Sequence, residues 1–495
     1  MLVILIGGGV YLWQNPKLLS SLRLPGSLPD LPVNDTKAAA LYVQGEEKYN
    51  KKDYKGAIAD FDEVIRLLPD YTDAYVYRGV AKDKLGDKKG AIVDYNEAIR
   101  LKPNYPLAYY NRGKVKDDLE DKKGAIADYT EAIGIKPDYV DAYFSRGYTK
   151  NNLGDKKGAI IDYTEAIRIK PDYAEVYYNR GDAKDDLGDK QGAIADYTEA
   201  IRIKPDYAYA YSSRGYVKDD LGNKQGAIAD YTEAIRIKPD YEYAYSNRGD
   251  AKRDLGDNQG AISDYNEAIR LKPNNSRTYS DRGYVKNQLG NKQGAIADYT
   301  EAIRLKPDYE YAYSKRGDAK RDLGDKQGAI ADYNEAIRLK PNNSRTYSDR
   351  GDAKSELEDY QGAIADFNEA IRLKPDYAYA YGKRGFAKGL LKDYQGALFD
   401  FNEVVRINPN EALAYNNRGL VKDLLGDKQS ALSDFNKAIS INPNEALAYA
   451  NRGRMKAESG DKQGARMDLQ KAAEFFKQQG DTKRYNAVTN LIEQL

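Results

Sequence analysis

Small, aromatic and apolar residues recur along this chain at fixed positions within repeats of 34 residues. Twelve prolines, from Pro69 to Pro443, stand 34 residues apart, and each repeat is numbered here so that this proline is position 32. Alanine at position 20, an aromatic residue at position 24 and an apolar pair at 27 and 28 share one face of a helix. Positions 3, 7, 10 and 14 form the packing face of an earlier helix. The pattern therefore predicts two helices in each of thirteen repeats, over residues 38–479.

Polar and flexible residues mark the expected helix ends. Asp or Asn follows every one of these prolines, as at Asp70, and can cap the first helix of the next repeat through its side-chain oxygen. Pairs such as Leu85-Gly86 end that helix, because glycine adopts the left-handed conformation of a helix stop. The next residue, here Asp87, can cap the second helix, which ends before a Lys-Pro pair. Such short connections make the two helices antiparallel neighbours.

Position 8 is glycine in all thirteen repeats, from Gly45 to Gly453, and position 20 is alanine throughout. Glycine inside a helix costs about 1 kcal/mol relative to alanine. Paying that cost in every repeat needs a reason, and a close approach of the two helices at this crossing supplies one. The aromatic residue at position 24 is expected to fill the adjacent space.

These positions together resemble the signature of the tetratricopeptide repeat (TPR) family. In the second repeat the matching residues are Tyr75, Gly79, Ala91, Tyr95, Ala98 and Pro103. The resemblance covers about nine tenths of the chain. It implies an all-α fold, a right-handed α-solenoid of antiparallel helix pairs. It also implies a concave groove lined by the first helices, with protein–protein recognition as its usual work.

The chain departs from the family pattern at charged positions. Position 7 is arginine in twelve repeats, position 11 is lysine in all thirteen, and position 23 is aspartate in all thirteen. In one interpretation the Arg and Lys stems cover the helix interface and pair with the aspartates. In the other they form a cationic stripe that contacts a ligand.

Positions 2, 5, 9 and 12 of the first helix share a face opposite the packing face, and in the TPR family they line the groove. Here these positions vary while the scaffold stays constant, as a recognition surface should. Repeats 2 to 6 are acidic there, with residues such as Asp73, Asp117, Asp182 and Asp219, while later repeats introduce Tyr and Arg, which are enriched at binding hot spots. The expected partner-binding residues are Tyr209, Tyr216, Tyr243, Arg253, Arg277, Tyr284, Tyr311, Arg321, Arg345, Tyr379 and Phe386. The alternative is that a long helical array simply needs solvated faces.

The repeats are also close copies of one another. Residues 242–275 and 310–343 differ only at Asn247 against Lys315, Asn258 against Lys326, and Ser263 against Ala331. The duplicated block is two repeats long, which indicates growth by tandem duplication. Array length can therefore itself be the property that matters.

Composition narrows the function classes. Lys and Arg number 78 against 77 Asp and Glu, so the net charge of +1 argues against a nucleic-acid binder. Histidine and cysteine are absent, which removes the commonest general base and the thiol nucleophile. The carboxylates recur in every repeat and mark architecture rather than one active site. We therefore expect no enzyme activity, no cofactor or metal, and no small-molecule substrate.

The two ends lie outside the repeats. Residues 1–13 are apolar throughout, and we expect a membrane anchor, an export signal, or a segment folded onto the first repeat. Residues 14–37 read as a proline-rich linker. Residues 480–495 suit a capping helix, with Tyr485, Val488, Leu491 and Ile492 on one apolar face.

Two function hypotheses follow. The first is a scaffold or adaptor, attached to a membrane through residues 1–13, that binds partner proteins or peptide segments in the groove. Its array would be cytoplasmic, or exported if the apolar segment is a signal. The second is a membrane-attached structural spacer or self-associating arm without a dedicated peptide ligand.

Overall fold

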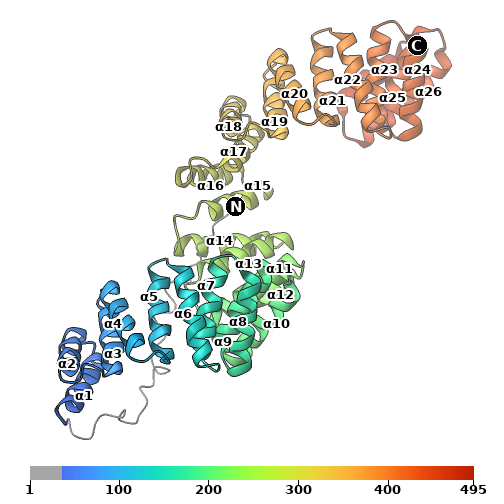
Figure 1. Ribbon diagram of the computed structural model, residues 1–495. Helices are drawn as coiled ribbons and strands as arrows, with labels where there is room; N and C mark the ends of the chain where they lie inside the picture. The colour runs from blue at the N-terminus through green and yellow to red at the C-terminus, as the bar shows by residue number, and fades with distance from the viewer. Residues whose placement is uncertain (1–35) are drawn as a thin grey trace. The chain divides into compact units, whose positions relative to one another are not determined.

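The computed structural model describes residues 36–495, and every regular element within that range is an α-helix (Figure 1). The predictions for residues 1–35 lie outside the described residues. Contacts divide the chain at residue 237 into an N-terminal part and a C-terminal part, which are described separately. The helices of the N-terminal part are α1 (Thr36–Asn50), α2 (Tyr54–Leu67), α3 (Thr72–Lys84), α4 (Lys88–Leu101), α5 (Pro106–Asp118), α6 (Lys122–Ile135), α7 (Val140–Asn152), α8 (Lys156–Ile169), α9 (Ala174–Asp186), α10 (Lys190–Ile203), α11 (Ala208–Asp220) and α12 (Lys224–Ile237).

The C-terminal part continues the same two-helix pattern. Its helices are α13 (Glu242–Asp254), α14 (Asn258–Leu271), α15 (Ser276–Gln288), α16 (Lys292–Leu305), α17 (Glu310–Asp322), α18 (Lys326–Leu339), α19 (Ser344–Ser355), α20 (Tyr360–Leu373), α21 (Ala378–Leu390), α22 (Tyr394–Ile407), α23 (Ala412–Leu424), α24 (Lys428–Ile441), α25 (Ala446–Glu458), α26 (Lys462–Gln478) and α27 (Thr482–Glu493).

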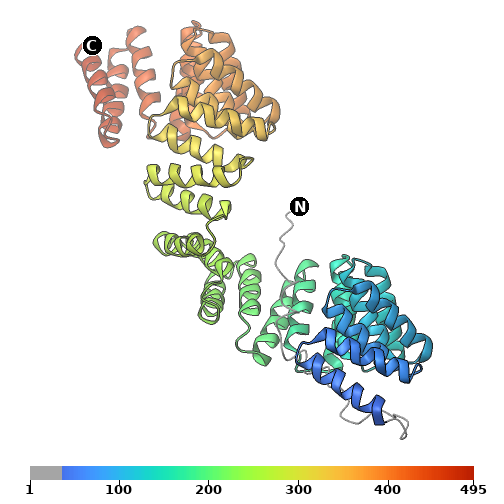
Figure 2. The same ribbon diagram turned by 90° about the vertical axis from the view of Figure 1, so that its left-hand side faces the viewer.

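Within each part, the helices pack in the order of the chain (Figure 2). An odd-numbered first helix packs against the even-numbered second helix of its repeat, and that helix packs against the first helix of the next repeat. The predicted all-α solenoid of antiparallel helix pairs is therefore confirmed. No helix among residues 36–495 has the combination of length and apolarity that a membrane span needs.

The predicted cap of the second helix is confirmed. Asp87 is the N-cap of α4, and its carboxylate accepts a hydrogen bond of 2.9 Å from the backbone N–H of Gly90. The residue before this cap has a positive φ in every repeat, as at Gly86, where φ is +86°. Glu120 adopts the same conformation without the freedom of glycine, with φ at +64°.

The predicted cap of the first helix is wrong. The N-cap of α3 is Tyr71, one residue after Asp70, and its side chain makes no capping hydrogen bond. The reason is a turn in which the N–H of Tyr71 donates to the carbonyl of Leu68, so that Pro69 and Asp70 occupy its two central positions. Where tyrosine gives way to Asn275 or Asn343, the asparagine side chain does cap the helix.

The position-8 glycines pack as the sequence predicts. A Cβ atom on Gly181 would stand 2.8 Å from Cε1 of Tyr197, the position-24 aromatic of the same repeat. Tyr197 is buried, and the aromatic at this position is buried in every repeat from Phe61 to Phe435. The glycine therefore gives the ring its space and lets the two helices of each repeat approach closely.

The stack ends on α27. Val488 is buried against Leu469 and Phe476 of α26, with Tyr485 and Ile492 partly buried beside it. Leu491, predicted on the same apolar face, is instead 39% exposed, because only one narrow stripe of this helix contacts α26. The C-terminal helix thus covers the apolar side of the last repeat, as a capping helix does.

Candidate protein-interaction surface

The repeated Arg, Lys and Asp residues form one internal ion-pair ladder. In the fifth repeat, Asp196 on α10 is 4% exposed. One of its oxygens lies 2.7 Å from Nη2 of Arg180, and the other lies 2.8 Å from Nζ of Lys184, both on α9. Because each cation is paired within its own repeat, the architectural interpretation holds and the cationic stripe does not.

The same ladder also joins successive repeats. Nη1 of Arg112 on α5 donates to Oδ1 of Asn96 on α4, at 2.7 Å, while its other nitrogens hold Asp128. Its guanidinium also lies 5.4 Å from the ring centre of Tyr109, at a distance typical of a cation–π contact. The position-7 arginine, present in twelve repeats, can therefore hold three neighbouring positions as Arg112 does, which explains why it recurs.

The predicted groove face of the first helix is narrower than expected. Position 5 is buried in most repeats, as at Val76, Ser280 and Ser348, each fully enclosed. A first helix is packed on two sides, against its own second helix and against the preceding repeat. Residues at positions 2, 9 and 12 remain at least partly exposed, except Asp352 at position 9, which is buried.

The predicted aromatic residues on this face differ in exposure. Four are exposed, namely Tyr216, Tyr311, Tyr379 and Phe386. Tyr209, Tyr243 and Tyr284 are partly buried. Leu413 on α23 extends the exposed apolar residues of α21 beyond Phe386. The aromatic and apolar character predicted for this face is therefore present at the surface of the C-terminal part.

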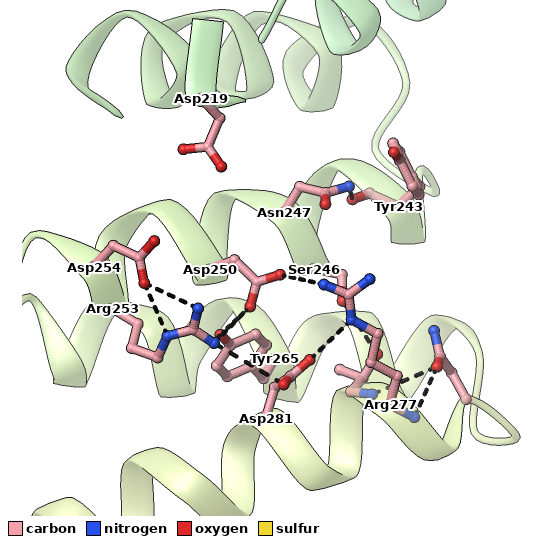
Figure 3. A network of polar contacts seen from close by, with 12 residues as sticks. Asp219, Tyr243, Ser246, Asn247, Asp250, Arg253, Asp254, Tyr265, Arg277 and Asp281 are labelled. Atoms are coloured by element: carbon pink, nitrogen blue, oxygen red, sulfur yellow. Dashed lines mark hydrogen bonds and ion pairs between the residues drawn. The ribbon is translucent and has the colours of Figure 1, made fainter. Parts of the chain in front are cut away.

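The predicted arginines of repeats 7 and 8 lie in a network with carboxylates (Figure 3). Asp250 on α13 accepts from Arg253 at 2.9 Å, from the hydroxyl of Tyr265 at 2.7 Å and from Arg277 at 3.2 Å. Arg277 also approaches Asp281 on α15 at 3.4 Å. Burial raises the pKa of Asp281 to about 6, helped by the charge of Asp250 and opposed by the two arginines. The guanidinium of Arg253 is thus largely paired with carboxylates of the chain itself, whereas the side chain of Arg277 is exposed.

Repeats 9 and 10 carry a second version of this network. Arg321 on α17 lies 3.7 Å from Asp352 on α19, which also accepts a hydrogen bond of 2.5 Å from the hydroxyl of Tyr379. Arg345 is exposed and lies 3.7 Å from Asp349. Burial, together with the charge of Asp318, raises the pKa of the Asp349 carboxyl to about 6.

The acidic residues of the N-terminal part include one carboxylate in an unusual setting. Asp182 on α9 accepts a hydrogen bond of 2.6 Å from the hydroxyl of Tyr197. Burial raises the pKa of Asp182 to about 7, and the charges of Asp186 and Asp185 add to this effect, whereas the hydroxyls of Tyr197 and Tyr178 oppose it. Some other acids of this face are paired with lysines, as Asp185 is with Lys190 at 2.8 Å.

Models of the TPR motif match repeatedly along this chain. They match residues 84–116, 151–188, 249–290, 283–324, 317–357 and 351–392 in one form described as TPR repeat. A second model, described as tetratricopeptide repeat, matches residues 174–207 and 412–445. A third model with the same description matches residues 107–139 and 208–241. The chain belongs to the tetratricopeptide repeat family. Among curated proteins, no sequence matches this TPR chain significantly.

Solved structures similar to this TPR protein share its helical repeats at low sequence identity. The Cut9–Hcn1 hetero-tetramer of the APC/C matches with a TM-score of 0.41 and 15% identity, over 85% of this chain and 96% of the other. Yeast Tom70 matches with a TM-score of 0.35 and 16% identity, over 86% and 96%. A tetratricopeptide repeat protein from Parabacteroides merdae gives 0.38 and 21%, over 50% and 98%. Similarity at this level carries no argument about function.

Position 6 of the TPR first helix belongs to the surface network but was missed from the sequence. Asp281, Lys315, Asp349 and Lys383 all occupy it, and each contacts a charged or aromatic side chain of the network. The segment SRTYSDRG occurs at residues 276–283 and again at 344–351, and this exact repetition of Asp281 and Asp349 is the signal that could have revealed them.

Proposed function

We propose that this protein is a non-enzymatic scaffold that binds segments of partner proteins on the face formed by positions 2, 9 and 12 of its first helices. The observation that carries this proposal is the contrast between two sets of residues. The residues at positions 11 and 23 are the same in all thirteen repeats, position 7 is arginine in twelve, and these residues pair with one another. The face, in contrast, carries varied and exposed side chains such as Tyr311, Tyr379 and Phe386. Membership of the TPR family supports a role in protein interaction.

The non-enzymatic part of the proposal rests on how the carboxylates are used. The aspartates at position 23 are buried and shared by an arginine and a lysine of the same repeat. No group of three or more potential metal ligands occurs within residues 36–495. The aspartates that recur at position 23 in every repeat therefore have a structural role.

Attachment to a membrane through residues 1–13 also remains a proposal, and with it a location of the array at the membrane surface. Its support is the uninterrupted apolar character of that segment. Fractionation of cells that express the full chain or residues 36–495 tests it. The full chain should sediment with membranes and the shorter chain should not.

Affinity capture with a matched pair of variants tests the scaffold proposal. In the first, Tyr243, Arg277 and Tyr311 on α13, α15 and α17 are replaced by alanine. In the control, the same is done to Arg270, Arg304 and Arg338, which are exposed on the second helices of the same repeats. Circular dichroism checks that both remain helical. Partners should be lost from the first variant and kept by the control, whereas loss from both or neither contradicts the proposal.

A second candidate, a spacer without a dedicated ligand, is favoured by the near identity of residues 242–275 and 310–343. Deletion of residues 242–309 removes one complete block of two repeats. A spacer would become shorter and keep every partner, whereas an adaptor would lose partners that contact the deleted block.

A further inference from the structure

Asp182 is an acceptor site without a cation. It lies on the surface face of α9, is partly buried, and accepts a hydrogen bond from the hydroxyl of Tyr197. No lysine or arginine among the described residues forms an ion pair with it, whereas Asp117, Glu175 and Asp185 on this face each have such a partner. A buried carboxylate that lacks a counter-charge is costly, and its cost falls when a cation arrives.

Two further buried oxygens in the neighbouring repeat lack partners. The hydroxyl of Tyr163 on α8 has no hydrogen-bond partner within the described residues, and the side chain is fully buried. Burial raises the pKa of this tyrosine, and the nearby charge of Asp182 raises it further. Oδ1 of Asn151 on α7 is likewise buried and unpartnered. The fourth repeat therefore holds two buried oxygens without partners, and the fifth holds a carboxylate without a cation.

The C-terminal part contains the same set of residues with a cation in place. Asn287 and Tyr299 occupy the positions of Asn151 and Tyr163, and their oxygens also lack partners. Asp318 occupies the position of Asp182 and accepts from the hydroxyl of Tyr333 at 2.9 Å. Here Nζ of Lys315, one turn before Asp318 on α17, lies 2.7 Å from the carboxylate.

The residue at the lysine position of the fifth repeat is Asn179. Its amide donates to the backbone carbonyl of Glu175 at 2.7 Å, and it supplies no charge to Asp182. The lysine is also absent from the duplicate of the ninth repeat, where Asn247 stands in its place. Lys315 thus shows that an ammonium group fits beside the carboxylate of Asp318. Asn179 supplies no such group to Asp182, so a cation from outside the chain can take the corresponding position.

We propose that the surface of α9 binds a Lys or Arg side chain of a partner segment, with its cationic group on Asp182 as Lys315 is on Asp318. The inference rests on the proposed function and names its partner: a protein segment with a basic residue for the N-terminal part of the array.

Binding of a defined peptide to the full chain tests this inference. The probe is a fluorescein-labelled peptide of alternating Gly and Arg, compared with the same peptide carrying Gln in place of Arg, and the readout is fluorescence anisotropy. The decisive variant is Asn179→Lys, which places the chain's own ammonium on Asp182. Asn179→Gln is its uncharged control.

We expect the Arg peptide to bind the native chain and the Asn179→Gln variant equally, and to bind Asn179→Lys and Asp182→Asn at least tenfold more weakly. Asp182→Asn keeps an acceptor for Tyr197, so the fold is retained. Asp186→Asn, which removes a charge from the same helix outside the site, should leave binding within twofold. The Gln peptide should not bind.

Equal binding of the Arg peptide to the native, Asn179→Lys and Asp182→Asn chains would overturn the inference. So would an equal loss in Asp186→Asn, because it would show that only the overall charge matters. The proposed function is judged separately, by the variants of α13, α15 and α17 that lie in the other part of the chain. Suppose that the α13, α15 and α17 variants lose their partners, while Asp182→Asn and Asn179→Lys leave binding of the Arg peptide unchanged. The scaffold proposal would then stand, and only the cation site at Asp182 would be refuted.

Discussion

Replacing Asp196 tests whether a buried ion pair contributes more to the stability of a repeat than an exposed ion pair does. This carboxylate is 4% exposed and is shared by Arg180 and Lys184 at 2.7 and 2.8 Å. Asp196→Ala leaves both cations without their counter-charge. On α10 the exposed pair of Glu199 and Arg202, with atoms 2.6 Å apart, offers a matched control in the same helix.

The expected cost follows from the exposure of the two cations. Breaking a buried ion pair costs about 3–5 kcal/mol. The side chains of Arg180 and Lys184 are 15% and 21% exposed, so some water can reach them. Arg180 also keeps a hydrogen bond to Thr164. We therefore expect about 3 kcal/mol for Asp196→Ala, and less than about 1 kcal/mol for Glu199→Ala.

Native-state hydrogen exchange on the full chain measures this difference. A repeat array opens locally, so a single melting temperature does not report on one repeat. The free energy of opening should fall by about 3 kcal/mol for the amides of α9 and α10 in Asp196→Ala, and hardly at all in α4. Asp196→Asn should give a smaller loss, because the amide oxygen still accepts from Arg180. Equal effects of Asp196→Ala and Glu199→Ala would refute the reasoning.

Three further predictions concern the fifth repeat. Gly181→Ala should destabilise it by about 1–2 kcal/mol in hydrogen exchange, because a Cβ 2.8 Å from the ring of Tyr197 outweighs the gain in helix propensity; unchanged exchange would mean that the ring can move. Asp189→Ala removes a cap and should lower the free energy of opening of the α10 amides by about 1 kcal/mol in hydrogen exchange. Asp172→Ala, in the turn after Pro171, should cost less than half as much in α9, and equal costs would mean that Asp172 is a cap after all. Burial raises the pKa of Asp182 to about 7, so folding binds a proton between about pH 4 and 7 and stability falls as the pH rises through that window. Asp182→Asn should therefore raise the free energy of opening of the α9 amides in hydrogen exchange at pH 8 and not at pH 5, and a gain at both would contradict this.

The helix caps were predicted correctly for the second helices and wrongly for the first helices. Asp87 and Asp70 both follow a helix-ending residue, and both look like caps. Only Asp87 caps a helix, because the Pro69-Asp70 pair is needed for the turn that Tyr71 closes onto Leu68. The competition between a cap and a turn depends on where the next helix begins, and the sequence alone does not mark that point.

The surface was harder to predict than the core. Gly181 and Tyr197 follow from a constant pair of residue types, and the structure packs them together. The first helices, however, contact neighbours on two sides, which buries position 5 and brings position 6 into the surface network. The ion pair of Lys315 and Asp318 follows from their i, i+3 spacing on α17, but position 6 had not been counted with this face.

Site-specific photo-crosslinking tests the central claim, that partners bind on the first helices, most directly. A photoreactive phenylalanine analogue replaces Tyr311, which is exposed on α17, or Arg304, which is exposed on the second helix α16. The account predicts that partners crosslink from position 311 and not from position 304. Partners that crosslink from position 304 alone, or equally from both, would contradict it.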